Sequence, residues 1–261
     1  MDKFDKKGWE ILDFNLDDDS ISKILNDCDG KYSYGKVHEN ENNRIFNAWR
    51  SSDDVRLLAT NDVILKHVEE RLGGSSFPFQ TLNFCKGTQQ PLHSDFYHFA
   101  SRNHSGMCGV WVALEDTNEK NGALSVLTGS HKNSYLFPED LDIPVGRKNN
   151  PYEHYKQYED AIQQFASSSE LELETLFLKK GQAVIWHSNL IHGGSPISDP
   201  NSTRFSQVTH YFRTGSAYYS PITSGKSAFS KSYRIPFNIS TGRRAYSALN
   251  PLDYGLDILG F

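Results

Sequence analysis

The spacing of hydrophobic and polar positions changes near residue 75. Before it, residues 17–28 and 51–74 carry apolar side chains at helical intervals behind Asp and Ser residues. Apolar residues three and four positions apart line one face of a helix, and the pair Gly73-Gly74 is typical of a helix end. Residues 8–16 alternate instead. The N-terminal part therefore predicts a first strand followed by two helices.

From residue 76 onward, short apolar runs alternate with turns such as "NEKNG" and "SDPNS". Runs of this length, rich in aromatic and branched residues, predict strands. Seven of them at this spacing favour a sandwich or barrel over a parallel βαβ sheet. The predicted strands cover residues 79–84, 92–99, 108–114, 122–127, 172–178, 182–187 and 204–212.

One long insertion, residues 131–170, separates these strands. Within it, residues 152–165 place Tyr155, Tyr158, Ile162 and Phe165 on one helical stripe. We interpret this stripe as packing, with a lid over a pocket as the alternative.

The chain is expected to form a single domain over residues 1–261. It divides into an N-terminal strand and helices at 1–75, a core at 76–212 that includes the insertion, and a tail at 213–261 that could act as a lid.

Composition narrows the class of protein. A net charge of −5 and a pI near 6.1 argue against a nucleic-acid partner. No apolar run is long enough to cross a membrane, and the N-terminus lacks the apolar segment of a secretory signal. Cys28, Cys85 and Cys108 are too few and too widely spaced for a disulfide framework or a zinc motif. We expect a cytoplasmic protein with a small-molecule substrate; the oligomeric state is left open.

Candidate chemistry begins at "PLHSDFYHF", where His93 and Asp95 lie one residue apart. On a strand, residues i and i+2 face the same side, so both side chains could reach one metal ion. Non-heme iron is bound by two histidines and one carboxylate, so a second histidine is needed from a distant strand. His192 is favoured because Gly193 and Gly194 leave room beside it, and the rival is His187.

Arg204 opens the last predicted strand, twelve residues beyond His192. It should share one face with Ser206, Val208 and His210. A guanidinium inside a barrel is costly without a carboxylate, and its geometry suits a bidentate carboxylate ligand. A dicarboxylate cosubstrate would explain Arg204 beside a metal, and an internal salt bridge is the alternative.

Three stretches, "FQTLNFCKGTQQPLHSD", "GVWVALEDTNEKNGALSVLTGSH" and "GQAVIWHSNLIHGGSPISDPNSTRFSQVTHY", resemble the phytanoyl-CoA dioxygenase-like branch of the iron(II)/2-oxoglutarate oxygenases. The resemblance implies a mainly β fold with flanking helices, the double-stranded β-helix or cupin-like jelly-roll. It implies that His93, Asp95 and His192 are catalytic and bind Fe(II), and that Arg204 pairs with 2-oxoglutarate. Asn83, Gln80 and Ser206 are further candidates for contacting this cosubstrate.

The same resemblance implies that O2 and 2-oxoglutarate are consumed while an aliphatic C–H of a small metabolite is hydroxylated, with release of succinate and CO2. Tyr97, His98 and Trp111 are candidates for the wall of the substrate pocket, although core packing is the favoured interpretation for each. Desaturation or cyclisation by the same chemistry is an alternative. A second alternative is a cupin-like protein that uses another metal, or a module that only binds a ligand.

Overall fold

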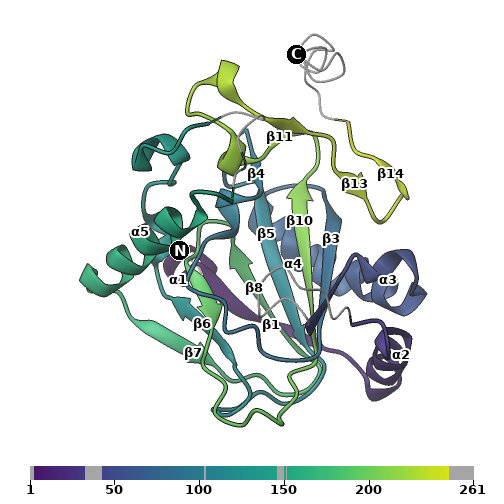
Figure 1. The fold of residues 1–261 in the computed structure, drawn as a ribbon. Coiled ribbons are helices and arrows are strands. Elements are labelled where there is room, and N and C mark those ends of the chain that lie inside the picture. The colour runs from purple at the N-terminus through teal and green to yellow at the C-terminus, as the bar shows by residue number, and fades with distance from the viewer. Residues whose placement is uncertain (1–2, 33–42, 103, 146–149, 151, 247–261) are drawn as a thin grey trace.

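A computed structural model of the chain describes residues 3–32, 43–102, 104–145, 150 and 152–246. Its centre is a pair of antiparallel sheets that face each other (Figure 1). The larger sheet has the strand order β1-β8-β5-β10-β3-β2, and the smaller sheet has the order β7-β6-β9. Their strands are β1 (Trp9–Asn15), β2 (Arg44–Phe46), β3 (Ser76–Phe84), β5 (Met107–Ala113), β6 (Leu124–Leu127), β7 (Leu173–Leu176), β8 (Gln182–His187), β9 (His192–Gly194) and β10 (Ser206–Arg213).

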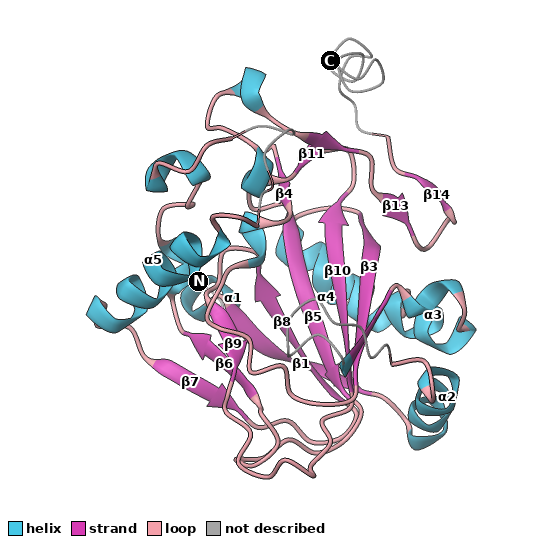
Figure 2. Cartoon of the chain, viewed as in Figure 1, coloured by secondary structure: helices cyan, strands magenta, loops and turns pink. Residues whose placement is uncertain are grey.

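Each face of the larger sheet packs against a different layer. Its inner face joins the smaller sheet in a core that includes Trp111, Val208 and Leu176. Its outer face is covered by helices, and there Val110 and Tyr211 pack against them. The two sheets and the covering helices make the jelly-roll with flanking helices that the sequence predicts (Figure 2). The helices are α1 (Lys3–Lys7), α2 (Asp18–Cys28), α3 (Asp53–Ala59), α4 (Asp62–Leu72) and α5 (Tyr155–Ser168).

The helix predicted over 51–74 is two helices, α3 and α4. Thr60 and Asn61 separate them: the Thr60 hydroxyl donates to the Arg56 carbonyl, and Asn61 leaves the helical conformation. The Asn61 side chain then accepts hydrogen bonds from the first amides of α4, as a strong N-cap does. Gly73 ends α4 with φ of +69°, as the sequence predicts.

The insertion and the tail pack together above one end of the sheets. In α5, Tyr158 and Ile162 are buried, as expected for a packing stripe. Lys226 in the tail forms an ion pair with Asp140 of the insertion. The tail adds β11 (Tyr218–Tyr219), which pairs with β4 (Ala100–Ser101) and β12 (Tyr233–Arg234), and the hairpin of β13 (Phe237–Asn238) and β14 (Arg243–Arg244). The end of the predicted tail, 247–261, lies outside the described residues.

The prediction of a strand over residues 92–99 is wrong. His93 forms only an isolated bridge with His192, and the chain then turns through a 3-10 helix at Asp95–Tyr97. Within the described ranges, no helix is both long and apolar enough to cross a membrane.

Candidate metal centre

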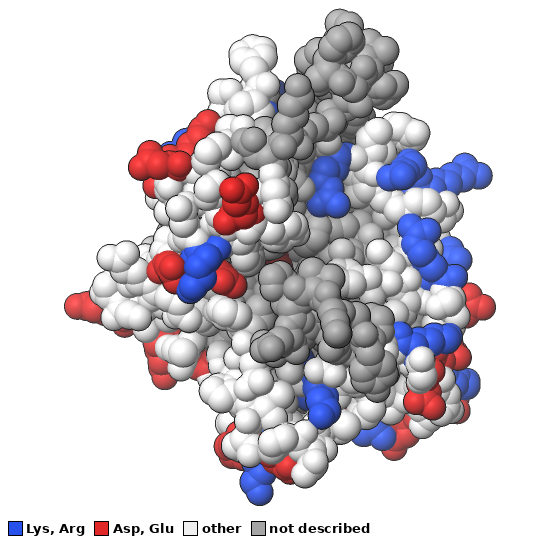
Figure 3. Space-filling model, viewed as in Figure 1, with Lys and Arg blue, Asp and Glu red and all other residues white. Residues whose placement is uncertain are grey.

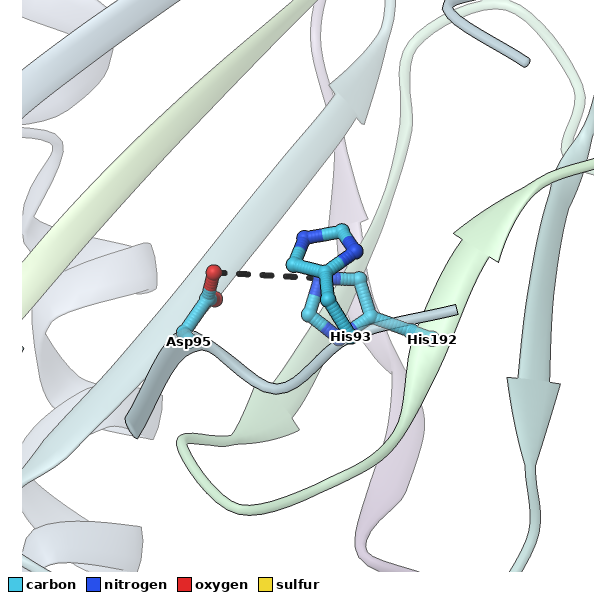
Figure 4. A group of neighbouring side chains, drawn as sticks. All are labelled: His93, Asp95 and His192. Atoms are coloured by element: carbon cyan, nitrogen blue, oxygen red, sulfur yellow. Dashed lines mark ion pairs between the residues drawn. The ribbon is translucent and has the colours of Figure 1, made fainter. Parts of the chain in front are cut away.

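His93, Asp95 and His192 meet in the interior between the two sheets. Each offers one ligand atom, and these atoms all lie within 4.8 Å of one another. All three side chains are buried. Figure 4 shows them converging: His93 precedes the 3-10 helix, Asp95 begins it and His192 begins β9. The His192 Nε2 atom lies 3.8 Å from an Asp95 oxygen. In the described part of the chain, no other group of three potential ligands comes together.

The backbone fixes the relative position of the two histidines. The amide of each donates to the carbonyl of the other, with both distances 2.9 Å. The Gly193-Gly194 pair makes this approach possible. A Cβ at Gly193 would lie 2.8 Å from the Gln90 carbonyl oxygen, and one at Gly194 would lie 2.8 Å from the Gln89 amide nitrogen. These glycines therefore make room for the segment that carries His93, and only indirectly for a metal.

Hydrogen bonds to the backbone also set which ring nitrogen is available. The His93 Nδ1 atom lies 2.9 Å from the Pro91 carbonyl oxygen, and the His192 Nδ1 atom lies 2.9 Å from the Leu190 carbonyl oxygen. A carbonyl can only accept, so each Nδ1 carries the proton. In the neutral ring the Nε2 atom then keeps its lone pair, which is how metal-binding histidines are commonly oriented.

The protonation states also suit a divalent cation. Burial, reinforced by His192, lowers the pKa of His93 to about 3, so its imidazole is neutral at neutral pH. Burial alone would raise the pKa of Asp95, but His192 and His210 together hold it well below its usual range. Two imidazoles and one carboxylate form the set that non-heme iron takes. The residues present therefore fit the iron that the sequence implies.

Two residues that the sequence did not assign to the site, Trp186 and His210, hold the Asp95 carboxylate. The Trp186 indole Nε1 donates to Asp95 Oδ2 at 2.8 Å, and the His210 Nε2 atom lies 3.5 Å from the same oxygen. Gly109 faces Trp186 across the sheet, and a Cβ there would overlap the indole ring. The glycine thus leaves the space in which the indole reaches Asp95.

Arg204 is buried on the inner side of the sheet without a carboxylate partner among the described residues. Its guanidinium lies 5.3 Å from the Trp111 ring and 5.8 Å from the Phe84 ring. Its one hydrogen bond within the described residues is a long one, 3.4 Å to the Lys86 carbonyl, and its Nε has no partner there. Burial lowers the pKa of Arg204 to about 10, against a raising effect of Glu115, so the side chain stays charged at neutral pH. The alternative of an internal salt bridge is therefore not what the described residues form.

The other predicted cosubstrate contacts separate into two groups. Ser206, two residues after Arg204, is fully buried, and its hydroxyl has no partner among the described residues. Gln80 lies opposite His210 on the inner face and its side chain contacts the His210 Nδ1 atom at 2.9 Å. The structure corrects the prediction for Asn83, whose side chain lies on the outer face of the sheet. There its amide donates to Gln207, which also bonds the backbone of α3.

The three candidates for the wall of the substrate pocket differ in their burial and contacts. Tyr97 is a correction: it is fully buried and stacks on Tyr158 with ring centroids 3.7 Å apart, so it belongs to the core. Trp111 is buried and flanks Arg204. His98 is half-buried, with its Nε2 atom 3.0 Å from the Tyr155 hydroxyl. His187 lies apart from the metal group and packs near Phe4 at the N-terminus.

A jelly-roll whose buried site holds two histidines and one carboxylate has the design of a non-heme iron protein. Comparison with known proteins agrees, since the family model described as Phytanoyl-CoA dioxygenase (PhyH) matches residues 7–205. The chain belongs to this family, as the sequence motifs predicted.

Alignments with curated relatives cover only part of each protein. The human peroxisomal phytanoyl-CoA dioxygenase is 31% identical over 137 residues, which are 50% of this chain and 38% of that protein. The chain thus spans well under half the length of this relative.

Solved structures share the fold at low identity. EctD from S. alaskensis, solved with 2-oxoglutarate and 5-hydroxyectoine, is 19% identical with a TM-score of 0.64, covering 85% of this chain and 78% of that one. The carbocyclase SnoK from nogalamycin biosynthesis, described as non-heme and alpha-ketoglutarate dependent, is 15% identical with a TM-score of 0.66, covering 84% and 86%. At this identity the two structures establish the jelly-roll fold of the chain.

Proposed function

We propose that this chain is an Fe(II)/2-oxoglutarate-dependent dioxygenase that hydroxylates an aliphatic C–H of a small metabolite. The observation that carries the proposal is the pairing of two features in one interior. A buried group of His93, Asp95 and His192 lies between the sheets, and the buried, charged Arg204 has no carboxylate partner among the described residues. A metal ion would satisfy the first, and a dicarboxylate would satisfy the second.

His93 and His192 would hold the iron through Nε2, and Asp95 through its carboxylate. Trp186 and His210 would keep that carboxylate in place. When bound, Fe(II) with 2-oxoglutarate and O2 supplies the oxidising power for attack on an unactivated C–H. In the overall reaction one oxygen atom enters the substrate and the other enters succinate, as 2-oxoglutarate loses CO2.

Arg204 would bind the far carboxylate of 2-oxoglutarate. Trp111 and Phe84 flank its guanidinium and limit the access of water, which strengthens a charge-assisted pair. Ser206, with its buried hydroxyl, would donate to the same carboxylate. Holding the cosubstrate at its far end fixes its orientation, and misplacement by about 1 Å can cost on the order of a hundredfold in rate.

The test is a screen of small metabolites that measures O2-dependent succinate release above the substrate-free rate, followed by mass spectrometry of the compound. A gain of one oxygen is the expected outcome. Loss of two hydrogens would replace hydroxylation by desaturation or cyclisation. Tight binding of compounds that emerge unchanged, without succinate, would overturn the proposal in favour of a binding module.

A single domain over 1–261, a cytoplasmic location and the absence of a nucleic-acid partner stay predictions from the sequence. The human relative is described as peroxisomal, so location needs its own measurement.

A further inference from the structure

An aromatic wall extends outward from the metal group on the side of Asp95. His210, which contacts Asp95, has the Phe99 ring at 5.3 Å and the Phe79 ring at 6.0 Å. Phe79 and Phe99 also meet edge to face at 5.3 Å. Both rings are only half-buried, unlike the closed core around Trp111. The wall therefore offers apolar surface to a molecule that approaches the metal group from this side.

A positive charge stands at the outer end of this wall. The Arg234 guanidinium lies 5.4 Å from the centroid of the Phe99 ring. The tail places it there, because β12 pairs with β11 and β11 pairs with β4, immediately after Phe99. The steps from Asp95 to His210, Phe99 and Arg234 are 3.5, 5.3 and 5.4 Å, so a molecule of metabolite size can reach both ends.

Arg234 is free to take an anion. Among the residues that the structure describes, no carboxylate forms an ion pair with it. Its guanidinium donates to the Ser220 hydroxyl at 3.1 Å, which in turn donates to the His98 carbonyl. This hydrogen bond orients the guanidinium without neutralising it, and the side chain is exposed.

The surface charge around this end agrees with an anionic ligand. On the face in Figure 3, Lys and Arg side chains gather mainly on the side of β13, β14 and α3, and acidic side chains are more frequent on the side of α5. The whole chain is acidic, with a net charge of −5, so this basic side is a local departure from the average. A local positive field attracts anions and raises their rate of encounter.

We propose that the primary substrate carries an anionic group, a carboxylate or a phosphate, that pairs with Arg234 while its aliphatic part lies along Phe99 and Phe79 toward the metal group. This substrate class rests on the proposed function, because the aliphatic carbon must end beside the metal. Arg234 is thereby the residue that selects the charge of the substrate. The aromatic rings select an apolar chain between the anion and the carbon that reacts.

The test uses the full chain with Fe(II) and 2-oxoglutarate in the absence of O2, and four probes of equal chain length: octanoate, octyl phosphate, octanamide and 1-octanol. Dissociation constants come from calorimetry and from the change in the visible iron–2-oxoglutarate band. At least one anion should bind about tenfold more tightly than its neutral counterpart. That advantage should shrink as the salt concentration rises. The anion that binds more tightly than its neutral counterpart shows whether the site prefers a carboxylate or a phosphate.

Arg234→Gln should weaken the preferred anion about tenfold and leave the neutral probes unchanged, whereas Arg234→Lys should restore part of the affinity. Arg243→Gln, on the exposed β14, is the matched control and should change neither. Equal affinity for anionic and neutral probes, binding of none of them, or equal effects of the Gln variants at 234 and 243 would each overturn the proposal.

The visible band before any probe is added reports the proposed function separately. The Arg234→Gln protein should show it as the unaltered protein does, because Arg234 is not among the three residues that would hold the metal. Loss of the band in every protein would count against the proposed function, whereas a normal band without anion preference would count against the substrate class alone.

Discussion

Arg204→Met separates a cosubstrate anchor from a structural arginine, because the two roles predict opposite changes in stability. Arg204 is 4% exposed and lies beside the rings of Phe84 and Trp111, with one long hydrogen bond to Lys86. A methionine would fill much of the same space with an apolar side chain that these rings accept. The variant therefore removes the charge and keeps most of the packing.

The size of the effect follows from the pKa of Arg204, which burial lowers from 12.5 to about 10. Each pKa unit is about 1.4 kcal/mol, so burying the unpaired charge costs on the order of 3 kcal/mol. Below pH 10 the guanidinium is charged in both the folded and the unfolded chain, so the whole penalty is present at neutral pH. Without 2-oxoglutarate, Arg204→Met should raise the free energy of unfolding by about 1–3 kcal/mol, since the Lys86 contact is lost as well.

When 2-oxoglutarate is bound, the unaltered protein should be more stable than Arg204→Met. Deleting one partner of a buried charge pair costs roughly 2–5 kcal/mol, which weakens the affinity for the cosubstrate about 30- to 5,000-fold. Calorimetry with Fe(II) measures that affinity. Urea unfolding measures stability with and without 2-oxoglutarate, and the stabilisation that the cosubstrate gives should disappear in the variant.

Arg213→Met at the exposed end of β10 is the matched control and should alter neither quantity. If Arg204→Met lowers the stability of the cosubstrate-free protein and leaves 2-oxoglutarate affinity intact, Arg204 is a structural residue and the reasoning fails.

Three further predictions concern the metal group and its surroundings. His192→Ala should abolish Fe(II) binding while His187→Ala should reduce only stability, and a calorimetric Fe(II) titration that gives the reverse order would move the third ligand. Trp186→Phe removes the 2.8 Å donor to Asp95 and should weaken Fe(II) binding about tenfold without unfolding the chain; unchanged affinity would show that the indole does not position the carboxylate. Burial lowers the pKa values of His93 and His187 to about 3 and 4. Below pH 6.5 these histidines are therefore protonated in the unfolded chain but stay neutral in the folded chain. The stability of the metal-free protein should therefore fall between pH 6.5 and 4, by up to about 1.4 kcal/mol per pH unit for each histidine, and urea unfolding of His187→Phe should show a smaller slope.

The strands of the core were predictable because each has one face in the interior. In β10 the alternation that places Val208 inward also places His210 there, two residues on, opposite Gln80. The same alternation from Arg204 predicts His210 on this face, but its contact with Asp95 comes only from the structure. Asn83 was misplaced for the converse reason: it neighbours the inward Leu82, and a shift of one residue in a strand exchanges the faces.

The segment around the first two ligands was not predictable from its composition. The run from Phe96 to Phe99 has the aromatic content of a strand, but it folds into a turn. The backbone amides of Tyr97, His98 and Phe99 bond back to Ser94 and Asp95. Tyr97 is buried in that turn by stacking on Tyr158 of α5, a contact between residues 61 positions apart. Local pattern cannot reveal such a contact. The His-x-Asp spacing still delivered both ligands to one point, because the bridge to β9 fixes His93 and the turn brings Asp95 round.

The most direct test of the metal centre is an anaerobic titration of the full chain with Fe(II) and 2-oxoglutarate, followed in the visible range. A charge-transfer band should appear only when both are present, at one equivalent of iron. It should be absent in His192→Ala, and admission of O2 should convert 2-oxoglutarate to succinate in the unaltered protein. No band and no succinate, in a protein that binds zinc or manganese and acts without O2 or 2-oxoglutarate, would contradict the account.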